Sequence, residues 1–91
     1  ANFNQDISQW DVSNVTKMNS MFYRSDYFNQ PLHNWDVSNV TEMSYMFYIT
    51  LNFNQDLSSW DVENVTSCAY FSEGASAWTL PQPNFTNCNP N

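Results

Sequence analysis

The sequence predicts an α/β solenoid of three coils, each built from a short strand, a turn and a short helix. The first observation is a strict period: Trp-Asp-Val begins at Trp10 and returns 25 residues later at Trp35, and again at Trp60. Upstream, Phe-Asn-Gln repeats in step. A fixed period of about 20–50 residues is typical of repeat architectures in which each unit is buried by its neighbours.

The first half of each unit has the pattern of a strand. In Trp-x-Val every second residue is apolar, which is the period of a strand with one buried face. An asparagine then turns the chain, because its amide hydrogen-bonds nearby backbone. The positions expected in the core from this half are Ile7, Trp10, Val12, Leu32, Trp35, Val37, Leu57, Trp60 and Val62.

The second half of each unit predicts a short helix. A threonine precedes it as a candidate N-cap, at Thr16, Thr41 and Thr66. Apolar residues then fall at i, i+3 and i+4, on one face of about two helical turns. A helix of this length depends on packing against neighbouring units. The apolar residues of this half are Met18, Met21, Phe22, Met43, Met46, Phe47, Cys68 and Phe71.

The repeat fades after Phe71, and a cap is expected to follow it. We divide the chain into a three-unit solenoid, residues 1–77 (1–25, 26–50 and 51–77), and a C-terminal cap, residues 78–91. Pro81 and Pro83 exclude regular helix and central strand there. A Cys68–Cys88 disulfide would hold this tail over the last unit and contribute ~3 kcal/mol in the chain-entropy model. The alternative is two free thiols, one of them buried and inert.

The composition limits the partners and the compartment. Nine acidic residues against two cations give a net charge of −7, which argues against nucleic acid and anionic membranes as partners. No apolar run approaches the ~20 residues of a membrane span. An even number of cysteines in a small chain favours an oxidising compartment. We therefore expect a secreted or cell-surface protein, either mature or excised from a longer chain.

The motif from Phe3 to Phe22 resembles a known bacterial repeat. It is Phe-Asn-Gln-Asp-Ile-Ser-x-Trp-Asp-Val-Ser-Asn-Val-Thr-x-Met-x-x-Met-Phe, and it closely resembles the repeat of about 25 residues often called BspA-like. That repeat occurs in lipoproteins and surface proteins of mycoplasmas and many other bacteria. The resemblance covers residues 1–72 and implies a leucine-rich-repeat-like stack of short strands backed by short helices. For function it implies surface exposure with adhesion or protein binding, and it brings no catalytic residue.

One aspartate per unit is a weak calcium candidate. Strands stacked ~4.8 Å apart would bring Asp11, Asp36 and Asp61 into a column. Calcium held between adjacent carboxylates would offset their repulsion. Alternatively, each carboxylate accepts backbone N–H bonds inside its own turn. We favour the turn, because no unit offers a second carboxylate at a fixed spacing, and we expect no cofactor.

Asparagine and glutamine columns are expected to form amide ladders between units, because a stacked amide hydrogen-bonds its neighbours. These columns are Asn4, Asn29 and Asn54; Gln5, Gln30 and Gln55; and Asn14, Asn39 and Asn64. Asn-x-Thr sequons are candidate N-glycosylation sites in a secreted protein. They begin at Asn14, Asn39, Asn64 and Asn84.

The sequence favours a non-enzymatic extracellular structural or adhesive module. His33 is the lone histidine, and no nucleophile–base pair accompanies it. Nothing resembling a cap precedes Phe3, so we expect this open end to stack on preceding repeats or, head-to-tail, on another molecule, which would build a surface fibre or stalk.

The alternative function is a protein- or glycan-binding module that recognises a host or matrix partner through the exposed strand face. That face would consist of Gln9, Asp11, Ser13, His33, Asn34, Asp36, Ser38, Ser59, Asp61 and Glu63.

Overall fold

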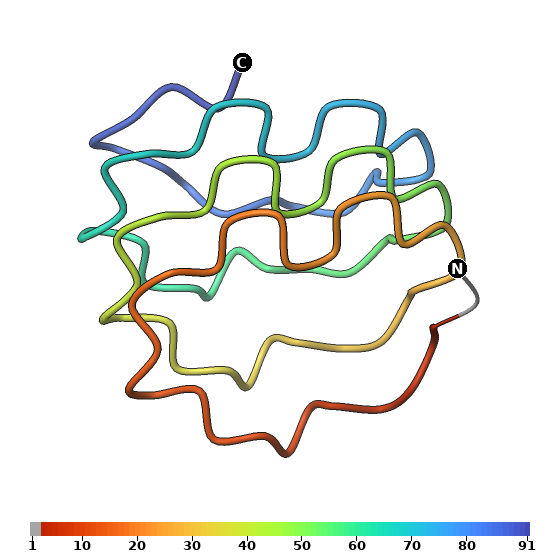
Figure 1. The fold of residues 1–91 in the computed structure, drawn as a ribbon, viewed down its shortest axis with the longest axis horizontal. Helices are drawn as coiled ribbons and strands as arrows, with labels where there is room; N and C mark the ends of the chain where they lie inside the picture. Colours follow the sequence, from red (N-terminus) through yellow and green to blue (C-terminus); the bar gives the residue numbers. More distant parts are fainter. Residues whose placement is uncertain (1–2) are drawn as a thin grey trace.

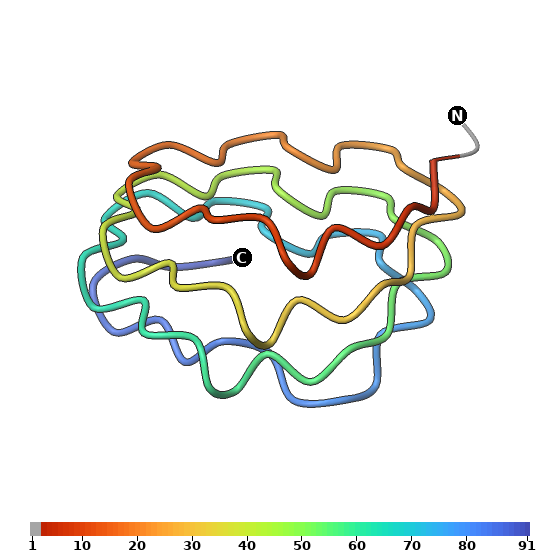
Figure 2. The same cartoon turned by 90° about the horizontal axis from the view of Figure 1, so that it is seen from below.

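The computed structural model describes residues 3–91, which wind into stacked coils closed by a tail (Figure 1). The first coil (red to orange) lies at one end of the stack and the tail (violet-blue) at the other. One side of each coil is folded into successive tight turns, and the other side is smoother. Figure 2 shows the coils as nested loops around a common interior. Ala1 and Asn2, with which the first expected unit begins, lie outside the described residues.

The expected secondary structure is wrong. Residues 3–91 contain no helix and no extended strand, and their only β-pairing is two isolated parallel bridges, Lys17 with Glu42 and Glu42 with Ser67. The chain is therefore not a leucine-rich-repeat-like α/β solenoid of strand–turn–helix coils. The period is confirmed, because equivalent residues 25 positions apart are hydrogen-bonded between coils.

The segment expected to be helical is a chain of β-turns. The amide groups of Met18, Ser20 and Phe22 each donate to the carbonyl oxygen 24 residues further along, at 2.9 Å. In an α-helix these groups would bond four residues back. Ser20 and Arg24 also have φ of 58° and 56°, a left-handed conformation that a right-handed helix does not contain. The backbone thus bonds across the stack instead of along the chain.

The apolar i, i+3, i+4 spacing has a different cause from the one expected. Turn hydrogen bonds run from the Met21 amide to the Met18 carbonyl at 3.3 Å and from the Ser25 amide to the Phe22 carbonyl at 2.9 Å. Successive turns return the chain to the same side every three or four residues, as a helix would. The expected N-cap threonines instead bond to each other, with the Thr41 amide donating to the Thr16 carbonyl at 2.7 Å.

The segment expected to be a strand lies between two turns. The Trp10 amide bonds the Ile7 carbonyl at 3.1 Å, and the Val15 amide bonds the Val12 carbonyl at 3.0 Å. The amide groups that a strand would use to bond its neighbour are used within these turns. Side chains then join the coils in place of a backbone ladder.

Asparagines make those joints, but not as the expected amide ladders, because each asparagine side chain bonds the backbone of a neighbouring coil and not the side chain of its counterpart 25 residues away. The Asn29 amide N–H donates to Asn4 Oδ1 and the Asn54 amide N–H donates to Asn29 Oδ1, both at 2.9 Å. In the second column, Asn39 Nδ2 donates to the Ser13 carbonyl at 2.8 Å and Asn64 Nδ2 to the Ser38 carbonyl at 2.7 Å.

Aromatic columns fill the interior. The rings of Phe28 and Phe53 stack with centroids 5.8 Å apart, and those of Trp35 and Trp60 with centroids 6.5 Å apart. Full burial of each such side chain stabilises the fold by roughly 1.5–3 kcal/mol. The residues expected in the core are buried, with the exception of Trp10 (55% exposed) and Met21 (38% exposed), both in the first coil.

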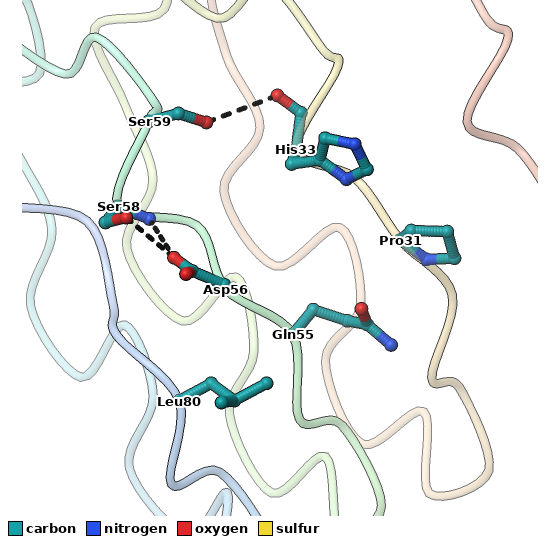
Figure 3. Close-up of a pocket in the computed structure, with 7 residues that line it drawn as sticks. All are labelled: Pro31, His33, Gln55, Asp56, Ser58, Ser59 and Leu80. Carbon is teal, nitrogen blue, oxygen red and sulfur yellow. Dashed lines mark hydrogen bonds between the residues drawn. The ribbon is translucent and has the colours of Figure 1, made fainter.

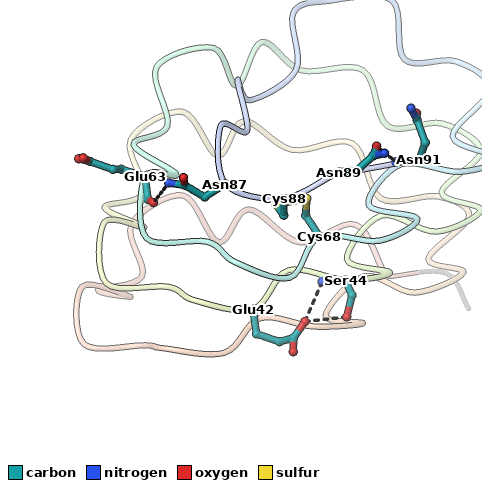
Figure 4. Close-up of a disulfide and its surroundings, with 8 residues drawn as sticks. All are labelled: Glu42, Ser44, Glu63, Cys68, Asn87, Cys88, Asn89 and Asn91. Carbon is teal, nitrogen blue, oxygen red and sulfur yellow. Dashed lines mark hydrogen bonds between the residues drawn. A yellow bond between two sulfur atoms is a disulfide. The ribbon is translucent and has the colours of Figure 1, made fainter.

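The tail is tied down as expected. The Cys68–Cys88 disulfide is present and joins residues 20 positions apart (Figure 4). Phe85 of the tail packs edge-on against Phe71, with centroids 4.9 Å apart. Asn87 Nδ2 donates to the Glu63 carbonyl at 2.7 Å, as Asn39 and Asn64 do to carbonyls of the coils before them (Figure 4). The tail thus continues the stack as a shortened coil.

Reduction of the disulfide tests the role of the tail. Cys88→Ser is expected to lower the free energy of unfolding by about 3 kcal/mol, because the loop of 20 residues is no longer closed in the unfolded chain. Chemical denaturation of the variant and of the reduced wild type measures the loss, and the two should agree. A loss below about 0.5 kcal/mol would contradict the account.

Candidate functional site

The expected binding face lies at the surface, but on turns. Eight of its ten residues are exposed, and Ser13 and Ser38 are half-buried. Gln9, Asn34 and Ser59 lie in turns at equivalent places in the three coils, and Ser13, Ser38 and Glu63 do the same one turn later. The face is therefore a set of turn tips, held in register by the asparagine joints beneath it.

Each aspartate of the calcium hypothesis bonds within its own turn. Asp36 Oδ1 accepts the Ser38 amide N–H at 3.0 Å and the Ser38 hydroxyl at 2.6 Å, and Asp11 has the same two bonds with Ser13. In the third coil Asp61 Oδ1 accepts the Glu63 amide N–H at 3.1 Å. This is the turn alternative, and it commits one oxygen of each carboxylate. No group of three or more His, Cys, Asp or Glu side chains in residues 3–91 could hold a metal ion.

These hydrogen bonds favour the charged form of Asp11 and Asp36. The Ser38 hydroxyl, followed by the Ser38 amide, lowers the pKa of Asp36, whereas the neighbouring charge of Asp11 raises it. Ser13 lowers the pKa of Asp11 in the same way. The Asp11 carboxylate is thus near enough to Asp36 to act on its pKa, as a column requires, and the hydrogen bonds from Ser38 oppose that repulsion.

A hollow of 430 Å³ lies at one edge of this face (Figure 3). Two of its residues, His33 and Ser59, were expected in the binding face, and the other five were not. Ser58 lowers the pKa of Asp56 through its hydroxyl and its amide, and the charge of His33 lowers it further. The hollow is lined by Pro31, His33, Gln55, Asp56, Ser58, Ser59 and Leu80.

The hollow opens where the repeat is broken. Pro31 stands where the neighbouring coils have Asp6 and Asp56, and His33 stands where they have a serine. The second coil therefore lacks the Asp-x-Ser turn that the first and third coils have at the equivalent position. These two departures were the sequence signal for the hollow, and they can be recognised only once the coils are aligned.

The sequon asparagines fall into two groups. Asn39 and Asn64 use the side-chain nitrogen, which a glycan would need, to bond the preceding coil. Asn14 and Asn84 are exposed, and neither side chain has a hydrogen bond within residues 3–91. Glycosylation stays a prediction, and Asn14 and Asn84 are the accessible sites.

Comparisons with known proteins identify a repeat family. Residues 1–85 match the model of a family described as "Mycoplasma protein of unknown function, DUF285". The chain matches no curated protein and no solved structure. No helix within residues 3–91 has the length and apolar character to cross a bilayer.

Removal of one serine hydroxyl tests the turn account. Ser38→Ala should raise the pKa of Asp36 towards its usual 3.8, because the hydroxyl is the largest cause of the lowering. A carboxyl group whose pKa is lowered by folding stabilises the fold above its unfolded pKa, and this contribution is lost as the pH falls through the folded pKa. The variant should therefore lose stability at pH 7 and less at pH 2.

NMR titration of the Asp36 carboxyl carbon measures the pKa directly. Ser13→Ala is the matched control, because it should raise the pKa of Asp11 and leave the bonds of Asp36 intact. An unchanged Asp36 pKa in Ser38→Ala would contradict the account.

Proposed function

The chain belongs to the DUF285 repeat family, and from this premise we propose that it is a non-enzymatic extracellular structural or adhesive module that assembles head-to-tail. The exposure of Trp10 carries the proposal. Trp10 is 55% exposed, whereas the equivalent Trp35 and Trp60, each covered by the preceding coil, are 4% and 5% exposed. A further coil of the same repeat, supplied by a second copy of the chain, would bury Trp10 in the same way.

The indole nitrogen of Trp10 supports this. Trp35 Nε1 donates to the Ile7 carbonyl at 3.0 Å, and Trp60 Nε1 donates to the Leu32 carbonyl at 2.9 Å. Each acceptor lies in the preceding coil. Within residues 3–91, Trp10 Nε1 has no acceptor, so the open face presents a large apolar side chain together with an unused donor.

The backbone edges of the stack are complementary. Inside the stack, the amides of Tyr45, Phe47 and Ile49 donate to carbonyls of the next coil at 2.8–3.0 Å. At the far end the equivalent amides of Tyr70, Ser72 and Gly74 have no backbone acceptor within residues 3–91, although the tail covers the core beside them.

At the other end of the stack, the first coil has backbone carbonyls that lack backbone donors within residues 3–91. The carbonyls of residues 17, 19, 21 and 23 receive no backbone hydrogen bond within the described part of the chain. One end therefore offers donors and the other acceptors, at the spacing already used between coils. Joining such ends is a heterologous contact that does not close, and it produces a filament.

The disulfide and the charge suit an extracellular setting. Disulfides persist in oxidising compartments, and Cys68–Cys88 holds the tail on the stack. A net charge of −7 argues against nucleic acid as a partner. We propose further that the chain is a BspA-like surface protein, on the strength of its long motif from Phe3 to Phe22.

The second candidate function is a binding module, and the hollow beside His33 favours it. A concavity with a few polar groups is a usual place for a ligand. The turn tips on the same face offer carboxylates and hydroxyls to a host or matrix protein or to a glycan.

A charge at Trp10 tests assembly. Trp10→Lys should reduce oligomers to monomers, because the lysine would have to be buried unpaired under the next coil. Light scattering and negative-stain microscopy over a wide concentration range are the measurements, and the melting temperature should change little because residue 10 is exposed in the monomer. Gln9→Lys is the control, with the same added charge on the neighbouring exposed residue.

A wild-type chain that stays monomeric at high concentration would sink the assembly proposal. An equal loss of oligomers in Gln9→Lys would show that charge alone, and not the Trp10 face, governs association.

Charge reversal on the turn face tests the second function. Asp36→Lys should abolish binding to an immobilised extracellular-matrix protein or a printed glycan array, because Asp36 lies at the centre of the face. Surface plasmon resonance with Glu73→Lys as the equally charged control measures it. Equal binding by both variants would exclude the turn face as the site.

A further inference from the structure

Four tyrosines form a file of rings across the turn side of the stack. The turn segments that carry them are the stepped traces in orange, green and blue in Figure 1. Tyr23 stacks on Tyr48, Tyr48 meets Tyr45 edge-on, and Tyr45 meets Tyr70, in each case with centroids 5.2 Å apart. We call Tyr23, Tyr45, Tyr48 and Tyr70 the tyrosine row. It runs from the first coil to the third.

Core packing does not explain the tyrosine row. Tyr23, Tyr45 and Tyr70 are 46%, 36% and 40% exposed. None of the four phenol hydroxyls has a hydrogen bond within residues 3–91. Contiguous exposed aromatic surface of this kind marks an interaction site more often than a free surface.

Two of the four tyrosines sit on strained backbone. Tyr45 and Tyr70 have φ of 59° and 56°, and Ser20 at the equivalent place in the first coil has φ of 58°. The turn thus imposes a left-handed residue here, a conformation that glycine and asparagine adopt at lower cost than tyrosine. Strained residues of this kind cluster at binding sites. Contacts between the rings offset part of the cost.

The charges near the row favour a neutral ligand. Both cations of the chain, Lys17 and Arg24, belong to the turn segment of Tyr23, whereas Glu42 and Glu73 belong to the next two segments. Charges of both signs along one row suit neither a polyanion nor a polycation, and the net charge of −7 repels polyanions in addition.

We propose that the tyrosine row binds a neutral polysaccharide laid across the coils. Pyranose rings present apolar C–H faces that stack on aromatic rings, and their hydroxyls can bond the free phenol groups. A file of rings suits an extended ligand of repeating rings better than a compact one. This site goes beyond the assembly proposed above. It lies on the turn side and includes neither Trp10 nor Asp36, so it depends neither on the exposed tryptophan nor on the face that carries the aspartates.

The test uses the full chain and neutral oligosaccharides. Isothermal titration with cellohexaose, xylohexaose and mannohexaose should detect binding to at least one, and polygalacturonate should bind at least tenfold more weakly. Tyr45→Asn with Tyr70→Asn should weaken binding at least tenfold while the melting temperature is kept or raised, because asparagine accepts the left-handed conformation.

Tyr27→Asn is the matched control. Tyr27 is 55% exposed but stacks on no other ring in residues 3–91, so its loss should leave binding unchanged. Trp10→Lys should also bind normally, which separates this site from assembly.

Three results would overturn the proposal: no binding of any neutral oligosaccharide, equal loss in Tyr27→Asn, or a change of oligomeric state in the double variant without oligosaccharide binding. The last would identify a second copy of the chain as the occupant of the row.

Discussion

The backbone hydrogen bond from one coil to the carbonyl 24 residues further along is the constraint on which the structure depends. In the second coil it joins Met43 to Ser67, Tyr45 to Ala69 and Phe47 to Phe71, at 2.8–3.0 Å. Alternate amides point to the next coil, so the residues between them can turn the chain without losing the register. Every coil then has a donor edge and an acceptor edge, and this polarity makes the two ends of the stack complementary.

The same constraint explains the backbone strain. The bonds between coils require left-handed residues at fixed places, and Ser20, Arg24, Tyr45, Ile49 and Tyr70 supply them without glycine. Such strain persists where the surroundings determine the conformation. Gly74 is the exception that the packing requires, because a Cβ there would lie 2.8 Å from Ile49 Cγ1.

The other half of each coil is held by side-chain hydrogen bonds. The residues that make these bonds can be told apart from the exposed residues that are available to a partner. Asparagine amides and tryptophan indoles donate to carbonyls of the preceding coil. They therefore serve to join the coils, even where the asparagine is exposed to solvent. Residues that make no such bond are free to meet a partner. On one face these are the turn tips around the hollow, and on the other they are the tyrosines.

The sequence predicted the period, the core and the disulfide, because each depends only on residue type and spacing. Met18 and Phe22 are buried as expected, and so are their counterparts in the next coil. The predictions of helix and strand were wrong. For the helix, the reason is that a chain of turns produces the same apolar spacing as a helix. The deciding feature is a left-handed φ at Ser20 and Arg24, and neither residue type signals it.

The candidate sites show the same limit. The aspartate turns could be anticipated, because Asp-x-Ser is a local motif. The hollow depends on Pro31 and His33 lying beside a neighbouring coil, and the tyrosine row depends on which side chains point outward. The period gives the alignment of the coils, but which side chains point outward depends on the turns, and these were not predicted.

Scalar couplings across hydrogen bonds test the central claim most directly. In an isotope-labelled sample, the Tyr45 amide nitrogen should couple to the carbonyl carbon of Ala69 in the next coil, and Phe47 to that of Phe71. A helical segment would instead couple Tyr45 to Thr41 and Phe47 to Met43, four residues back. The first pattern would establish the turn-built stack, and the second would contradict it.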